Sequence, residues 1–217
     1  ISILLRDVFL GLSKGGIVNE SMIKKMAKNP IVFALANPNP EIEYDLALNT
    51  RNDLIMATGR SDHPNQVNNV LGFPYIFRGA LDVRATKINE EMKLAAVKAI
   101  ALLAKEQVPD VVNEAYDAKS ISFGRKQIIP KPLDPRLIYW VAPAVAKAAM
   151  ASGVAKKPIK DWKKYELELM ERLGLGNKLI RNLTSKAKAS PKKVVFAEAD
   201  NYKILKAAEM ALEEGIA

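Results

Sequence analysis

The sequence predicts an α/β fold, in which part of a doubly wound (Rossmann-like) parallel sheet is followed by helices and by the start of a second αβ domain. Three observations lead to this prediction. Short apolar runs typical of buried strands alternate with helical segments at a spacing of roughly 25 residues. Polar loops directly follow two of these runs, and further along the chain the apolar spacing becomes helical. The chain has 217 residues, of which 49% are hydrophobic, so it can bury a substantial core.

The first five predicted elements are three strands joined by two helices. We expect strands and helices to alternate over the ranges 4–12, 19–28, 31–36, 41–49 and 54–58. Asn19 is the expected N-cap of the first helix, with Glu20 in its first turn. The run Asn37-Pro38-Asn39-Pro40 closes the second strand, because it combines two turn-forming residue types. An alternation of this kind indicates parallel βαβ units.

Helices dominate the remainder of the chain. We expect them over the ranges 68–81, 89–105, 141–150 and 204–215, with a further strand at 191–198. The second of these helices carries an apolar stripe, which we interpret as core packing. Arg78 and Asp82 are spaced i,i+4 and should share one helix face. Residues 128–136 contain three prolines within six positions and should be extended.

Composition excludes several classes of protein. The chain contains no cysteine, which excludes disulfides, thiolate zinc sites and cysteine nucleophiles and fits an intracellular, cytoplasmic protein. It has no apolar run long enough to span a bilayer and no signal-peptide pattern, so we expect no membrane partner. The sequence opens on Ile1, inside a predicted strand, and we therefore expect it to be a piece of a longer protein.

The net charge of +9 is concentrated in one segment. Between Lys156 and Lys193, about twelve Lys and Arg residues face about four acids. Such a segment could bind nucleic acid or an acidic partner, or it could be a solvated helical linker. Trp162 and Tyr165 are its only aromatic residues, too few for a stacking platform. We favour the linker and do not expect nucleic acid as a partner.

The most polar segment lies between the third predicted strand and the helix after it. Within eight residues it contains five amide or carboxylate side chains, at Asp62, Asn65, Gln66, Asn68 and Asn69. Carboxamides donate and accept hydrogen bonds in one plane, so they can orient a ligand amide or carboxylate without adding a charge. Ligands of doubly wound sheets bind beyond the carboxyl ends of the strands. We therefore expect the loops 37–40 and 59–69 to line one cleft. The alternative is that Asn37 forms an Asx turn and Asn69 caps a helix.

Other signatures of chemistry are missing from the sequence. No Gly-x-Gly-x-x-Gly follows a strand. His63 has no array of His, Cys or carboxylate residues around it, so we expect a solvated loop residue and no metal site. Lys131 is expected to be a surface lysine, with contact to a phosphate or carboxylate as the alternative. We place no catalytic residue and no metal ligand in this chain.

The sequence contains the runs Phe33-Ala34-Leu35-Ala36-Asn37-Pro38, Ala57-Thr58-Gly59-Arg60-Ser61-Asp62, Asn68-Asn69-Val70 and Ile129-Pro130-Lys131-Pro132. These and further runs, in this order over about residues 7–155, are highly specific and resemble bacterial malic enzymes. The form that the chain resembles is the large, NADP-dependent one with a C-terminal phosphotransacetylase-like domain. The resemblance assigns residues 1–155 to the C-terminal part of the NAD(P)-binding domain, 156–190 to a basic helical linker and 191–217 to a truncated start of the phosphotransacetylase-like domain. Ala199 and Lys203 depart from the usual pattern of that domain.

The resemblance implies oxidative decarboxylation of malate to pyruvate and carbon dioxide, with reduction of NADP or NAD. In the family a Tyr and a Lys act as acid and base and an acidic cluster holds magnesium or manganese; none of these residues is matched in this chain. Asn37 and Asn69 match the family's cofactor-binding asparagines, and Asn68 is the expected substrate-binding residue. A homo-oligomer or a missing N-terminal part should complete the site. The alternative is a non-catalytic remnant that acts as a nucleotide-binding or interaction module.

Overall fold

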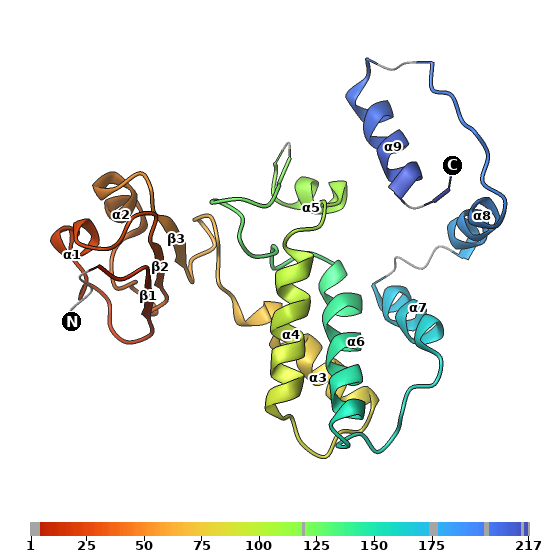
Figure 1. Ribbon diagram of the computed structural model, residues 1–217, viewed down its shortest axis with the longest axis horizontal. Coiled ribbons are helices and arrows are strands. Elements are labelled where there is room, and N and C mark those ends of the chain that lie inside the picture. The colour runs from red at the N-terminus through yellow and green to blue at the C-terminus, as the bar shows by residue number, and fades with distance from the viewer. Residues whose placement is uncertain (1–4, 119, 174–177, 198–199, 214, 217) are drawn as a thin grey trace. The chain divides into compact units, whose positions relative to one another are not determined.

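The computed structural model describes residues 5–118, 120–173, 178–197, 200–213 and 215–216. They belong to two compact units, residues 1–162 and 163–217. The first unit contains a parallel sheet with its own core and a group of helices with a separate core (Figure 1). The expected α/β fold with a Rossmann-like parallel sheet is confirmed.

Three parallel strands form the sheet, in the order β1 (Val8–Gly11), β2 (Ile31–Ala34) and β3 (Ile55–Thr58). Helices α1 (Glu20–Lys24) and α2 (Tyr44–Thr50) connect successive strands. The register pairs Gly11 with Ala34 and Ala34 with Thr58, so the three strands end level with one another. Their carboxyl ends therefore form one edge, as ligand binding in such sheets requires.

Both connecting helices cover the same face of the sheet (Figure 1). This follows from the strand order, because right-handed crossovers that step in one direction place their helices on one side. The core on that side is built from alternate strand residues and helix residues, including Phe9, Ile23, Val32, Ala47 and Met56. On the other face, Val8 and Leu10 are 54% and 58% exposed. The described strands thus correspond to one half of a doubly wound sheet, which carries helices on both faces.

The strands and helices of the sheet region are shorter than the sequence patterns suggested. Asn19 caps α1 as predicted, and its Oδ1 accepts a hydrogen bond from the Met22 backbone N–H at 3.0 Å. The second strand ends two residues earlier than expected, because the Ala36 N–H donates to the Glu41 carboxylate outside the sheet. For the same reason Glu41 lies before α2. The prediction that the helix begins at Glu41 is therefore wrong.

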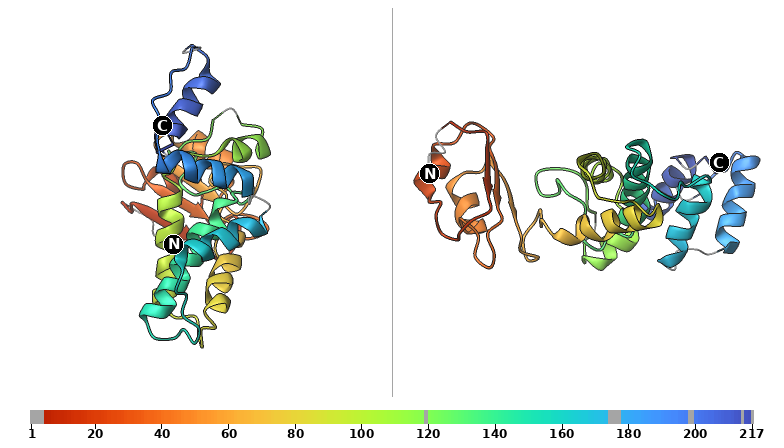
Figure 2. Two further views of the ribbon diagram at one scale, coloured as in Figure 1. Left: turned by 90° about the vertical axis from the view of Figure 1, so that its right-hand side faces the viewer. Right: turned by 90° about the horizontal axis from the view of Figure 1, so that it is seen from below.

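Helices α3 (Phe73–Asp82), α4 (Glu90–Leu103) and α6 (Arg136–Ala151) pack around the second core (Figure 2). The predicted helix 68–81 is divided into a 3₁₀ turn, η1 (Asn69–Leu71), and α3. The apolar stripe of α4 is confirmed as core, since its buried residues are Met92, Ala96, Ala99 and Leu103. Arg78 and Asp82 form the expected pair on α3, with Nε and Oδ2 2.8 Å apart.

The prediction that residues 128–136 are extended is wrong over the second half of this range, because turns lie at residues 132, 133 and 135 and α6 begins at Arg136. Asp134 explains the difference. Its backbone N–H donates to the Lys131 carbonyl at 3.0 Å, and its carboxylate accepts from both the backbone N–H and the side chain of Arg136. The Arg136 guanidinium also donates to the Gln107 carbonyl at 2.6 Å. The Arg136 side chain thus forms a buried ion pair with Asp134 and, through its hydrogen bond to Gln107, joins the start of α6 to the segment that precedes α5 (Asp110–Ala115).

The second unit contains most of α7 (Trp162–Arg172), together with α8 (Lys178–Ala189) and α9 (Tyr202–Glu213). Helices α7 and α8 lie in the basic segment, and its role as a linker stays a prediction. The strand predicted at 191–198 is wrong over its described part, residues 191–197, where the structure has no strand. An isolated strand is not stable without neighbours to pair with. Ala199 lies outside the described residues, and the assignment of this unit to a particular domain stays a prediction.

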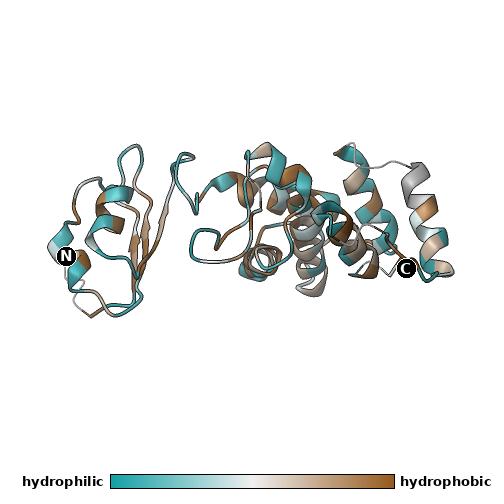
Figure 3. Cartoon of the chain, turned by 90° about the horizontal axis from the view of Figure 1, so that it is seen from above, coloured by the Kyte–Doolittle hydropathy of each residue, from teal (hydrophilic) through white to brown (hydrophobic). Residues whose placement is uncertain are grey.

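Hydropathy follows the packing of the first unit. Figure 3 shows hydrophobic residues on the strands and on the packed helices. In the part of the chain that the structure describes, no helix is both long enough and apolar enough for a membrane span.

Candidate functional site

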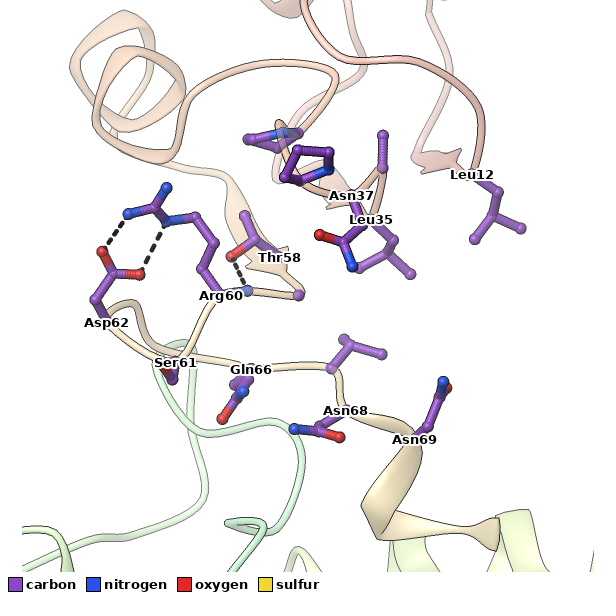
Figure 4. Close-up of a pocket in the computed structure, with 15 residues that line it drawn as sticks. Leu12, Leu35, Asn37, Thr58, Arg60, Ser61, Asp62, Gln66, Asn68 and Asn69 are labelled. Carbon is purple, nitrogen blue, oxygen red and sulfur yellow. Dashed lines mark hydrogen bonds and ion pairs between the residues drawn. The ribbon is translucent and has the colours of Figure 1, made fainter.

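A cleft of about 850 Å³ opens at the carboxyl ends of the three strands (Figure 4). Its lining comes from the segments that directly follow each strand: Leu12 after β1, residues between Leu35 and Pro40 after β2, and residues between Thr58 and Asn69 at and after β3. The prediction that the loops 37–40 and 59–69 line one cleft is therefore confirmed. Level strand ends explain the result, because they bring loops that are distant in sequence to one edge.

Backbone pairing holds the second half of loop 59–69 against the end of β3. After Thr58 the chain turns away and then returns, so that Gln66 forms a parallel bridge with Thr58. The Val67 N–H donates to the Thr58 carbonyl at 2.8 Å. This return places Gln66 to Asn69 along the cleft.

Asn65 fixes the point at which the loop returns. Its side chain is buried, with 2% exposed, and its backbone has a φ of +56°. The Nδ2 group donates to the carbonyls of Met56 and Arg125 at 2.9 and 2.8 Å, and Oδ1 accepts from the Ile128 N–H at 2.9 Å. An asparagine suits this position, since it tolerates left-handed backbone better than most residues and its carboxamide is fully used. Sequence inspection noted Asn65 as one of several polar residues and did not identify this role.

The asparagines expected to bind cofactor and substrate all line the cleft. Figure 4 shows the side chains of Asn37 and Asn69 extending into the cleft from its two sides. The capping role that we considered for Asn69 belongs to Asn68, whose Oδ1 accepts from the Val70 N–H at 3.0 Å. Within the described residues, the carboxamides of Asn37, Gln66 and Asn69 make no hydrogen bond to protein. Three carboxamides are therefore free to bind a ligand.

An ion pair lies at the rim of the cleft. Arg60 Nη2 and Asp62 Oδ2 are 2.6 Å apart, and both side chains are about half exposed. The hydrogen bonds from Arg60 lower the pKa of the Asp62 carboxyl to about 2. Asp62 is therefore ionised at neutral pH, and the pair adds no net charge to the cleft.

His63 is not the solvated loop residue that we expected. Its ring stacks on Tyr44, with centroids 4.4 Å apart and planes at 8°, and its side chain is 19% exposed. Stacking of this kind adds to the burial of apolar surface and anchors the loop on α2. The sequence did not reveal it, because Tyr44 lies in a different element.

Lys131 is likewise not a plain surface lysine. Its Nζ lies 5.1 Å from the centre of the Tyr116 ring, and burial lowers the pKa of the Lys131 ammonium. It lines a separate hollow of about 480 Å³ that shares Ser61 and Asp62 with the cleft. Lys131 therefore does not line the main cleft.

A buried carboxylate behind the cleft was also missed. Glu41 is 0% exposed, although the sequence suggested that it began a helix. Its oxygens accept from the backbone N–H groups of Ser13 and Ala36, each at 3.0 Å. The sequence offered one signal of a buried carboxylate, because Glu41 stands between the apolar residues Pro40 and Ile42, both of which are buried in the structure. Elsewhere in the described chain, no group of three or more His, Asp or Glu side chains is placed to hold a metal ion.

Comparison with known proteins agrees with this geometry. Residues 2–122 match the sequence profile of the family described as malic enzyme, NAD-binding domain. The chain is 53% identical over 211 residues to the NADP-dependent malic enzyme of Escherichia coli, and 50% identical over 212 residues to the NAD-dependent malic enzyme of Rhizobium meliloti. Each alignment covers 97% of this chain and 28% of the relative, so the chain spans little more than a quarter of these relatives.

A solved structure shows the same similarity. The crystal structure of Entamoeba histolytica malic enzyme matches 99% of this chain and 40% of its own, with a TM-score of 0.68 and 31% sequence identity. The fold of this chain is therefore found within a longer enzyme.

Proposed function

This chain belongs to the malic enzyme family through its NAD-binding domain, and we propose that it forms part of the NAD(P) and malate cleft of such an enzyme. The observation that supports the proposal best is the meeting of two loops at one sheet edge, where Asn37 and Asn69 direct unpaired carboxamides into one cleft. The whole reaction is the oxidative decarboxylation of malate to pyruvate and carbon dioxide. The bound nicotinamide supplies the hydride acceptor.

The three asparagines have separate roles in this proposal. Asn37 and Asn69 hold the nicotinamide, because a carboxamide can pair with another carboxamide as both donor and acceptor. Asn68 contacts the substrate. Its Oδ1 is already engaged by the Val70 N–H, which leaves the Nδ2 group as a donor for a carboxylate oxygen of malate. The nicotinamide and malate are then both held in place, and their fixed relative orientation favours hydride transfer between them.

The cofactor can be either NADP or NAD. An NADP-dependent and an NAD-dependent relative share similar fractions of their residues with this chain. The described cleft residues therefore suit the nicotinamide that both cofactors contain. We further propose that the complete enzyme would hold magnesium or manganese on acidic residues outside this cleft, where the metal would supply Lewis-acid stabilisation of negative charge. A cytoplasmic location and a homo-oligomeric assembly complete the proposal.

The experiment compares turnover with binding. We expect the purified 217-residue chain to show no malate-dependent reduction of NADP, because the family's acid, base and metal ligands have no match here. We expect it to bind NADPH, measured by the fluorescence of the reduced nicotinamide. Turnover by the purified chain would contradict the view that the catalytic residues of the enzyme are not among these 217 residues.

A parallel titration with duplex DNA at two salt concentrations tests the alternative module. DNA binding that weakens steeply with salt, together with no binding of NADPH, would favour an interaction role for the basic segment between Lys156 and Lys193. Binding of NADPH without DNA binding supports the cofactor cleft.

A further inference from the structure

Glu41 joins the ends of two strands from inside the protein. Each carboxylate oxygen accepts one backbone N–H, Oε1 from Ser13 after β1 and Oε2 from Ala36 after β2. Within the described residues, no Lys, Arg or His forms an ion pair with this carboxylate. Its charge is therefore stabilised by hydrogen bonds from the two segments that lead into the cleft.

The surrounding backbone is built around the same residue. The Glu41 carbonyl accepts from the Val18 N–H at 2.9 Å, and the neighbouring Pro40 carbonyl accepts from the Gly16 N–H at 3.0 Å. A Cβ at Gly11 would lie 2.3 Å from the Glu41 Cδ, well inside contact distance. Only glycine at the end of β1 leaves room for the carboxylate.

A buried carboxylate is costly to desolvate, and an apolar side chain would fill such a position at lower cost. The charge does fix the positions of the two backbone N–H donors, since charge-assisted hydrogen bonds hold their donors more tightly than neutral ones do. One donor, Ala36, directly precedes the proposed cofactor residue Asn37, and the other, Ser13, directly follows the cleft residue Leu12. The carboxylate thus controls the backbone at two walls of the cleft.

We infer that Glu41 is a positioning residue of the cofactor cleft, which sets the place of Asn37 by fixing the segments after β1 and β2. This inference rests on the proposed function. Glu41 acts through the backbone and does not line the cleft itself.

The test is Glu41→Gln, with Glu91→Gln as the matched control. A glutamine has one acceptor oxygen, so its NH₂ group must face one of the two backbone N–H donors. We expect the Kd for NADPH of the purified chain to rise about tenfold. Glu91 is exposed on α4 and does not line the cleft, so its substitution should leave the Kd unchanged. If Glu41→Gln fails to fold, Glu41→Asp replaces it, since it keeps the charge but is too short to reach both donors.

Amide hydrogen exchange separates positioning from general stability. We expect the Ser13 and Ala36 amides to exchange slowly in the unmodified chain and at least about tenfold faster in the Glu41 variant, while the amides of β2 and β3 keep their protection. Unchanged exchange at both amides, or unchanged NADPH binding in the variant, would overturn the inference. If the unmodified chain fails to bind NADPH, the proposed function fails, and the inference that Glu41 positions a cofactor wall fails with it.

Discussion

Replacing Asp134 by asparagine is expected to lower the free energy of unfolding by about 3–5 kcal/mol. Asp134 and Arg136 are 2% and 10% exposed at their side chains, with Oδ2 and Nη2 2.7 Å apart. Asparagine keeps the shape but removes the charge, which leaves a buried guanidinium without its counter-ion. Chemical denaturation followed by circular dichroism measures the loss.

The chain provides a control with the same pair of residues and the same spacing. Arg60 and Asp62 also form an Arg–Asp pair two residues apart, but their side chains are 46% and 54% exposed. Asp62→Asn should therefore lower the free energy of unfolding far less than Asp134→Asn does. The double variant Asp134→Asn with Arg136→Met should be more stable than Asp134→Asn alone, because it removes the unpaired charge. Equal effects of Asp134→Asn and Asp62→Asn would contradict the account of the buried pair.

The second large effect is expected at Asn65. Asn65→Ala removes three hydrogen bonds and leaves the Met56 and Arg125 carbonyls and the Ile128 N–H without this partner. We expect a loss of about 2–4 kcal/mol in the free energy of unfolding, since the hydrogen bond to Met56 is buried and the other two are partly buried. The same denaturation measurement applies.

Two comparisons separate the causes. Asn65→Gly removes the same bonds but adopts the φ of +56° without strain, so it should be less destabilising than Asn65→Ala if the backbone contributes. Asn49→Ala is the control, because Asn49 is exposed on α2, and its effect should stay within about 0.5 kcal/mol. A loss at Asn65 no larger than that at Asn49 would show that the three bonds add nothing.

The sheet could be predicted because its signals are local. Apolar runs bounded by Asn-Pro and Gly gave all three strands, and Asn19 marked the start of α1. The predicted strand at 191–198 shows the limit of such signals. Its apolar residues resemble those of β2, but the described residues 191–197 form no strand, because a strand also depends on neighbours that its own sequence does not specify.

The position of the cleft could be predicted for a related reason. Parallel strands that end level bring the loops after them together, so Asn37 and Asn69 could be assigned to one cleft before the structure was known. The residues that hold the cleft in place could not be predicted from the sequence. Glu41 binds Ser13 across 28 positions, and Asn65 binds Ile128 across 63. Contacts over such separations depend on the complete fold, and neither residue type signals its partner.

In the proposed function, Asn37 and Asn69 bind the nicotinamide and Asn68 binds the substrate at the same end of the cleft. The most direct measurement follows the side-chain NH₂ signals of the asparagines by NMR while the chain is titrated with NADP. We expect the signals of Asn37 and Asn69 to shift with one common Kd, the signal of Asn68 to respond when malate is added, and the signal of Asn49 to stay unchanged. If saturating NADP leaves the signals of Asn37 and Asn69 unmoved, or shifts only residues of α7 and α8, these asparagines do not bind the cofactor.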